Sequence, residues 1–166
     1  MKIQKSDKTF AALGVLGACI LLVGHLLKSP EYFFIVGSIA LLITALHYQL
    51  IYFIALECIL TACYLSMLLG ISFYSQTALP ILLCFQLLVF FLMLGKQNIF
   101  LLIIGIGGIV LLSLGLSYEN QWMYCIGSSA VAFYAFLMAY KGSKAAYIWA
   151  GLNTVFAIMA LYQALS

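Results

Sequence analysis

The stretch from Leu50 to Gly70, LIYFIALECILTACYLSMLLG, places the strongest constraint on how this chain can fold. The hydrocarbon core of a bilayer is about 30 Å thick and needs roughly 20 helical residues to cross, which matches this apolar stretch. Its single charged residue is Glu57. A carboxylate inside such a span costs at least a few kcal/mol unless it is protonated, paired or hydrated. We therefore expect a membrane-spanning helix, with Glu57 as the first candidate for a functional residue.

The rest of the chain has the composition of a polytopic membrane protein. Of its 166 residues, 67% are hydrophobic and 7% are charged, whereas charged residues make up about a quarter of a typical soluble domain. Seven lysines, with no arginine, oppose four acidic residues and give a net charge of +3. The chain has no basic patch with interleaved aromatic residues that would predict nucleic-acid binding. The five cysteines lie in apolar runs without CxxC spacing, so we expect no metal site and no redox cofactor.

Hydropathy and polar breaks divide the chain into seven predicted membrane-spanning helices of an all-α fold. One helix over 32–70 would be about 58 Å long, so we expect the chain to turn at the polar residues His47 to Gln49. The first apolar run is longer than that of a signal peptide, so we expect a retained helix capped by Ser6 or Asp7. The predicted helices cover residues 10–27, 32–46, 50–70, 78–95, 99–116, 122–140 and 145–165, with a polar loop over 72–77.

The distribution of lysines predicts the orientation of these helices. Seven spans place the two termini on opposite sides of the membrane, and lysines accumulate on the cytoplasmic side. A cytoplasmic N-terminus and an outer C-terminus, in a bacterial inner membrane, leave only Lys28 outside. The lysines then predicted to be cytoplasmic are Lys2, Lys5, Lys8, Lys96, Lys141 and Lys144.

A weak internal repeat groups the predicted helices. An ungapped shift of 90 residues aligns Gly17 with Gly107 and Gly37-Ser38 with Gly127-Ser128, and it superimposes helix boundaries. Because the first helix of each group would cross the membrane in the same direction, the two repeats would be parallel. Chance alignment of shared leucines and glycines is the alternative. The predicted organisation is one integral membrane domain over 1–166, with three-helix bundles over 10–70 and 99–165 joined by a connector helix over 78–95.

This arrangement of three, one and three helices resembles the SWEET, PQ-loop and PnuC-like (MtN3-type) transporters. The resemblance covers nearly the whole chain and rests on topology rather than on motifs. Trp149 and Asn153, within YIWAGLNTVF, are similar to the Trp and Asn that line the pathway of such transporters. The resemblance implies that a sugar or a vitamin passes between the two three-helix bundles.

Few polar side chains lie inside the predicted spans. Glu57, Thr61 and Tyr64 occupy positions i, i+4 and i+7 and so share one helix face, which should contact protein or a water-filled cavity. Lys144 could neutralise Glu57 if the third and seventh helices are neighbours. Either a structural pairing, a proton-accepting glutamate or a substrate contact would explain this carboxylate.

The remaining polar and small residues allow structural roles. Asn153, which shares a face with Trp149, needs a hydrogen-bonding partner and serves either as interhelical contact or in the pathway. We expect Ser38 and Ser128 to bond back to carbonyls of their own helices. Glycine faces on the first and fifth helices favour close packing, either within the monomer or with another subunit or copy. These small residues are Gly14, Ala18, Gly105, Gly107 and Gly108.

Two functions fit these features. The first is a small inner-membrane protein that moves a small solute across the membrane, with a polar cavity containing Glu57 and Asn153. The alternative is a non-catalytic structural or channel-lining subunit of a multi-protein membrane complex, such as a secretion system. Proton or ion conduction through Glu57 is a third possibility. No Ser/His/Asp set, HExxH motif or phosphate loop occurs, so we expect no enzymatic activity and no cofactor.

Overall fold

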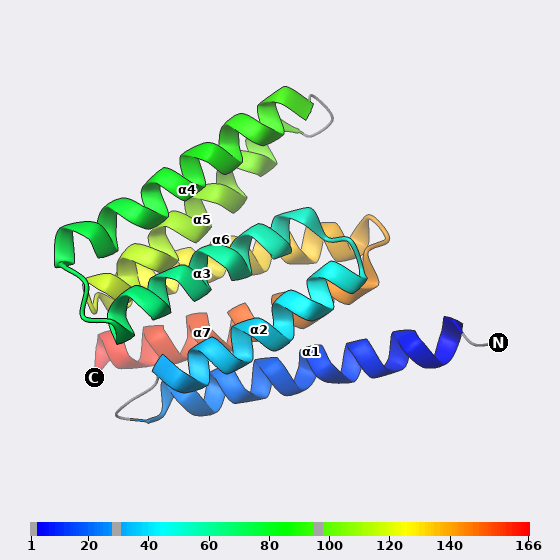
Figure 1. The fold of residues 1–166 in the computed structure, drawn as a ribbon, viewed down its shortest axis with the longest axis horizontal. Helices are drawn as coiled ribbons and strands as arrows, with labels where there is room; N and C mark the ends of the chain where they lie inside the picture. The colour runs from blue at the N-terminus through cyan, green and yellow to red at the C-terminus, as the bar shows by residue number, and fades with distance from the viewer. Residues whose placement is uncertain (1–2, 28–30, 95–97) are drawn as a thin grey trace. The chain divides into compact units, whose positions relative to one another are not determined.

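The computed structural model describes residues 3–27, 31–94 and 98–166, and these ranges are helical with short turns and no strand. The predicted all-α class is therefore confirmed. Figure 1 shows the helices in chain order. They are α1 (Ile3–His25), α2 (Glu31–His47), α3 (Ile51–Leu68), α4 (Phe73–Leu94), α5 (Ile99–Ser117), α6 (Gln121–Tyr140), the short 3₁₀ helix η1 (Lys144–Ala146) and α7 (Tyr147–Leu165).

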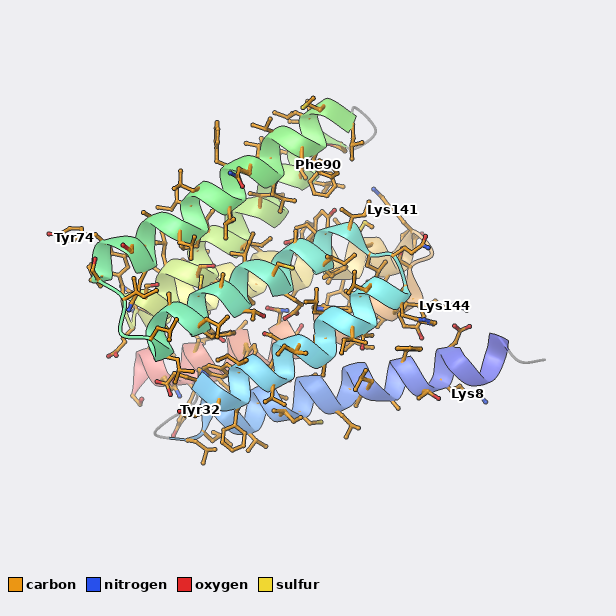
Figure 2. All side chains as sticks on the ribbon, in the orientation of Figure 1. Lys8, Tyr32, Tyr74, Phe90, Lys141 and Lys144 are labelled. Carbon is orange, nitrogen blue, oxygen red and sulfur yellow. The ribbon has the colours of Figure 1, made fainter. Side chains whose placement is uncertain are left out.

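Six of these helices are long and apolar enough to cross a membrane, as in an integral membrane protein. The remaining apolar helix, α2, has 17 residues. Exposed aromatic side chains lie at several helix ends, where Tyr32 is the second residue of α2 and Tyr74 the second residue of α4 (Figure 2). Tyrosine at the ends of spanning helices is typical of the membrane–water interface.

Two helix starts differ from the predicted ones by five residues or more. The first helix begins at Ile3, so Asp7 lies inside α1 and does not cap it. The predicted polar loop over 72–77 is wrong, because α4 already begins at Phe73. Polar side chains there bond to nearby backbone: the Gln76 amide donates to the Ile71 carbonyl and the Thr77 hydroxyl to the Tyr74 carbonyl. These local bonds let polar residues form the first turns of a helix.

The predicted turn after the second helix is confirmed. α2 ends at His47, and Gln49 takes a positive φ of 54° before α3 begins at Ile51. The Leu50 amide donates to the Ala45 carbonyl across this turn, at 3.0 Å. Such a bond closes the last turn of a helix when a following residue adopts the left-handed conformation.

Three of the lysines used to predict the orientation, Lys2, Lys28 and Lys96, lie outside the described residues.

Residue contacts divide the chain into two compact units, Met1–Leu68 and Leu69–Ser166. In the first unit, α2 packs against both α1 and α3. In the second, α5 packs against α4 and α6, and α6 packs against α7. Each unit therefore contains a helix held between the helices that precede and follow it in the chain.

Glycines allow α1 and α2 to approach closely. A Cβ atom added at Gly17 would lie 2.9 Å from the Ala40 Cβ and 2.9 Å from the Gly37 carbonyl oxygen. One added at Gly37 would lie 2.6 Å from the Leu21 Cγ. Near the other end, a Cβ at Gly24 would be 2.8 Å from the Phe33 Cβ. Small residues at such contacts let two backbones approach closely, which strengthens packing between membrane helices.

The second unit contains a similar helical hairpin, made by α5 and α6. A Cβ atom added at Gly108 would lie 3.0 Å from the Ala130 Cβ. One added at Gly127 would lie 2.8 Å from the Leu112 Cα and 2.9 Å from the Gly108 carbonyl oxygen. At the turn, Gly115 faces the backbone and Cβ of Tyr124. Gly108, Gly115 and Gly127 thus serve packing inside the chain.

Candidate functional site

Glu57 lies in the middle of α3 with 1% of its surface exposed. The helix is continuous there because residues 51–68 contain neither glycine nor proline. Thr61 and Tyr64 follow at one and two turns on the same face, as their spacing predicts. Tyr64 is buried, and the half-buried Thr61 has a buried hydroxyl without a hydrogen-bond partner among the described residues. The third helix therefore carries a buried polar face inside an apolar span.

An aromatic pair sets the level of α2 relative to α3. The ring centroids of Phe34 and Tyr64 lie 4.8 Å apart. The two helices are antiparallel across a short turn, so one turn inward from Phe34 on α2 is level with one turn inward from Tyr64 on α3. Those positions are Ser38 and Thr61. Glu57 lies one further turn along α3. Ser38, Thr61 and Glu57, which all carry side-chain oxygens, therefore lie within about one turn of the same level of the α2–α3 pair.

Ser38 was not among the site residues that the sequence predicts. Its side chain is fully buried, and its hydroxyl has no hydrogen-bond partner among the described residues. The expectation that it bonds back to its own helix is therefore wrong, and the same holds for Ser128 in α6. A buried hydroxyl without a partner costs about 1–3 kcal/mol. Only the packing of one helix on another reveals this cost, so no sequence pattern could have identified these two serines.

In the second unit, Trp149 and Asn153 lie on one buried face of α7, as predicted. Trp149 is fully buried, and Asn153 is 4% exposed. The Asn153 amide donates to the Trp149 carbonyl of its own helix at 3.0 Å. One turn further along α7, the Phe156 ring packs against Tyr124 of α6 with centroids 5.8 Å apart. Ser128 lies one turn inward from Tyr124 on α6.

Lys144, the predicted charge partner of Glu57, is an exposed residue at the start of η1 in the second unit. Figure 2 shows it with Lys141 at the turn between α6 and α7. Glu57 belongs to the first unit, so a Lys144–Glu57 ion pair stays a prediction.

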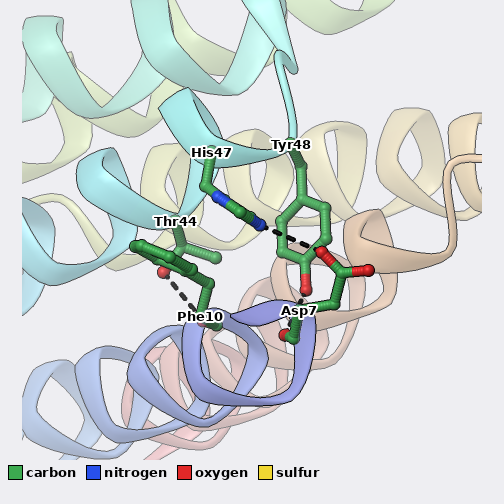
Figure 3. A network of polar contacts seen from close by, with 5 residues as sticks. All are labelled: Asp7, Phe10, Thr44, His47 and Tyr48. Carbon is green, nitrogen blue, oxygen red and sulfur yellow. Dashed lines mark hydrogen bonds and ion pairs between the residues drawn. The ribbon is translucent and has the colours of Figure 1, made fainter. Parts of the chain in front are cut away.

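A polar network closes one end of the first unit (Figure 3). The Asp7 carboxylate lies 3.1 Å from His47 Nε2, and the Tyr48 hydroxyl donates to the Asp7 carbonyl at 2.6 Å. The His47 ring stacks on Phe10 with centroids 3.9 Å apart, and the Thr44 hydroxyl lies 3.2 Å from the Phe10 carbonyl. Burial and the negative charge of Asp7 raise the pKa of Tyr48 above 10, so its hydroxyl stays protonated and donates at neutral pH.

An open groove of about 420 Å³ runs between α6 and α7. Small residues and bulky apolar side chains together line it. Two hydroxyls along it bond to their own helices, from Ser129 to Cys125 and from Thr154 to Ala150. The exposed surface of the groove is therefore mostly apolar. Residues along it include Ala132, Phe133, Phe136, Ala157, Ile158 and Leu161.

Comparisons of the chain with protein-family models, with curated proteins and with solved structures found no match.

Proposed function

We propose that this protein is a small membrane transport protein in which two related three-helix groups, α1–α3 and α5–α7, each contribute a polar layer to the path of a small solute. The observation that carries the proposal is a similar arrangement in both groups: a pair of aromatic rings and, one turn further inward on the same two helices, a pair of polar residues. In the first group the rings are Phe34 and Tyr64, and the polar residues are Ser38 and Thr61. In the second group the rings are Tyr124 and Phe156, and the polar residues are Ser128 and Asn153.

Packing contacts support this correspondence with a small correction to the 90-residue shift. Gly17 meets Ala40 in the first hairpin, and Gly108 meets Ala130 in the second. The first helices therefore correspond at a shift of 91 residues and the second helices at 90. The aromatic pairs set a shift of 92 for the third helices, from Tyr64 to Phe156. Changes of one or two residues in the connecting turns account for the differences, which an ungapped comparison of leucine-rich helices misses.

Polar residues in these layers favour a transport role over simple packing. Ser38 and Ser128 are fully buried, and neither hydroxyl has a hydrogen-bond partner among the described residues. Buried polar groups are usually satisfied by protein or by internal water. Polar side chains within membrane spans typically face a water-filled cavity or a substrate path. At a shift of 92 residues, Glu57 of the first group corresponds to Trp149 of the second. The two layers would thus present different chemistry to a solute.

The proposal includes seven spans with a cytoplasmic N-terminus in a bacterial inner membrane. The 17 residues of α2 fall at the lower end of the length that crosses a bilayer. Its packing on α1 and α3, both long enough to span, supports a transmembrane position. Exposed Lys8, Lys141 and Lys144 lie near helix ends that this orientation assigns to the cytoplasmic side.

Cysteine accessibility tests whether water reaches the polar layers. In a background in which the five native cysteines are replaced by serine or alanine, Thr61→Cys and Ser128→Cys should react with a membrane-impermeant thiol reagent from at least one side of the membrane. A variant that keeps only the native Cys58 is the matched control, because Cys58 is exposed in the middle of α3 and should contact lipid. If neither layer position reacts above the Cys58 control, the interior is sealed and the transport proposal is wrong.

Thermal stabilisation of the purified protein tests solute binding. A panel of sugars and water-soluble vitamins should contain at least one compound that raises the Tm of the wild type. A ligand at a hundred times its Kd stabilises a protein by about 2.7 kcal/mol. The Asn153→Leu variant should lose this response, while Asn120→Ala at the start of α6 should keep it. No shift with any member of the panel would count against this solute class.

The alternative proposal is a subunit of a larger membrane complex. Its supporting observation is that a Cβ atom added at Gly107 or at Gly151 would meet nothing within 4 Å. These glycines leave smooth positions on α5 and α7 against which a helix of another subunit or copy could pack. Affinity purification from native membranes followed by mass spectrometry should then recover partners in stable stoichiometry. A chain recovered alone would exclude this alternative.

A further inference from the structure

We propose that Glu57, together with the hydroxyls of Ser38 and Thr61, forms an internal proton-binding site in which the Glu57 carboxyl takes up the proton. This inference names the ligand of the polar layer in the first unit, and its role in transport rests on the function proposed above. The site itself is defined by residues of α2 and α3 alone.

The chemistry of the site begins with the carboxyl group. Glu57 is 1% exposed within an apolar helix. An ionised carboxylate in such a span costs several kcal/mol, and protonation removes that charge. A buried acid that gains and loses a proton is the usual element of proton relays in membrane proteins. The hydroxyls of Ser38 and Thr61 lie within about one turn of its level, and hydroxyls can form hydrogen bonds with both the protonated and the ionised carboxyl group.

The two hydroxyls are the second observation. Ser38 is fully buried, Thr61 has a buried oxygen, and neither has a hydrogen-bond partner among the described residues. Each can donate one hydrogen bond and accept two. A single internal water usually makes about three hydrogen bonds to otherwise unsatisfied polar groups. One water between these hydroxyls and the carboxyl would therefore satisfy the hydroxyls and carry a proton to or from Glu57.

Other titratable groups near the site lie on α2 and on α3 itself. On α2, which packs against α3, they are Glu31, Tyr32 and His47, at or next to the helix ends. On α3 itself, Tyr64 follows Glu57 by two turns, and its ring partner Phe34 lies 6.5 Å from the His25 ring. In the opposite direction, the turn carries His47 hydrogen-bonded to Asp7. Titratable groups thus lie at both ends of the first unit, and Cys58 and Cys63 lie nearer to Glu57 on α3 itself. The titratable residues of α3 are Tyr52, Glu57, Cys58, Cys63 and Tyr64.

Reaction with a hydrophobic carbodiimide measures proton occupancy directly, because the reagent adds to a protonated carboxylic acid within the membrane. The wild-type protein in proteoliposomes should be labelled on Glu57 at acidic pH, and labelling should fall as the pH is raised. Peptide mass mapping locates the adduct. Glu57→Gln should abolish the α3 adduct, whereas Asp7→Asn, which alters an acid that is 51% exposed, should leave it unchanged.

The hydroxyls make a separate prediction. Hydrogen bonds to an ionised carboxylate favour the ionised form. Ser38→Ala and Thr61→Val should therefore shift the labelling midpoint to a proton concentration about tenfold lower, one pH unit higher. Ser113→Ala in the second unit is the matched control, because this buried hydroxyl bonds to the Ile109 carbonyl of its own helix and lies outside both polar layers, and it should leave the midpoint unchanged. Midpoints that stay the same in the Ser38 and Thr61 variants would overturn the assignment of these hydroxyls to the site.

Three results would overturn the proton site itself. One is that the folded protein carries no label on Glu57 at any pH, although the denatured protein is labelled there under the same acidic conditions. Another is labelling that does not change with pH. The third is suppression of labelling by sodium chloride but not by choline chloride at fixed pH, which would assign the site to sodium. Labelling of Glu57 that depends on pH, in a protein that fails the cysteine test, would contradict transport while supporting proton binding.

Discussion

Tyr48 donates a hydrogen bond of 2.6 Å to the backbone carbonyl of Asp7, which joins the α2–α3 turn to the first helix across 41 positions of the chain. The Asp7 side chain reaches His47 in the same turn at 3.1 Å. Asp7 therefore holds the turn through both its backbone and its carboxylate. The sequence indicated only that a polar turn would lie here.

Replacing Tyr48 by Phe should lower the free energy of unfolding by about 1 kcal/mol at neutral pH, because it removes one hydrogen bond and leaves the ring. Thermal or denaturant unfolding of the detergent-solubilised protein measures the change. Tyr32→Phe is the matched control, since this tyrosine is 64% exposed at the start of α2. Equal stability of the Tyr48 variant and wild type would show that the bond to Asp7 contributes nothing.

The contribution of Tyr48 should also depend on pH. Burial, followed by the charge of Asp7, raises the pKa of Tyr48 above 10, so the folded state favours the neutral phenol. Stability from this group is present below pH 10 and is lost as pH rises through the folded-state value. The stability difference between wild type and Tyr48→Phe should therefore shrink above pH 10. A difference that grows in alkaline solution would contradict this sign.

Gly127→Ala should destabilise the second unit by about 1–3 kcal/mol, because the added methyl would overpack the α5–α6 contact. That methyl would lie 2.8 Å from the Leu112 Cα, a backbone atom that cannot move aside by rotating a side chain. Gly107→Ala is the matched control. Its added methyl meets nothing within 4 Å, so the better helix propensity of alanine should leave stability equal or raise it by up to about 1 kcal/mol. Unfolding measurements on both variants test the contrast.

Ser38→Ala should lower the free energy of unfolding by less than Ser113→Ala does, because the Ser38 hydroxyl has no protein hydrogen-bond partner among the described residues and would lose at most a bond to an internal water. Ser113→Ala is the matched control, because the equally buried Ser113 hydroxyl donates to the Ile109 carbonyl at 2.8 Å. That variant should lose about 1 kcal/mol. A Ser38 variant less stable than the Ser113 variant would mean that Ser38 makes a strong stabilising interaction.

Asn120→Ala should cost about 1 kcal/mol of stability at the start of α6. The Asn120 side chain accepts a hydrogen bond from the Met123 amide at 3.1 Å and so caps the helix. Asn120→Asp retains an acceptor and should recover most of the loss. Chemical denaturation of the three proteins measures the effect, and an aspartate variant as unstable as the alanine variant would argue against capping.

Hydropathy alone predicted the helical class and most helix positions, because a bilayer demands long apolar segments. The turn after His47 followed from length, since one helix over 32–70 would be about twice as long as a bilayer is thick. The start of α4 was missed, because polar residues there bond to their own backbone and extend the helix. Asp7 was assigned to a cap, whereas its partners lie about forty positions away and depend on how the first unit packs.

The candidate site divides in the same way. The sequence by itself determined that Glu57, Thr61 and Tyr64 share a face of α3 and that Trp149 and Asn153 share one of α7, because helical periodicity follows from spacing alone. Only the tertiary structure decided that Ser38 of α2 lies level with Thr61 of α3. Phe34 and Tyr64 fix the level of α2 against α3, and whether a buried hydroxyl finds a partner depends on that level. Periodicity acts within one helix, whereas hydrogen-bond satisfaction is a property of packed helices.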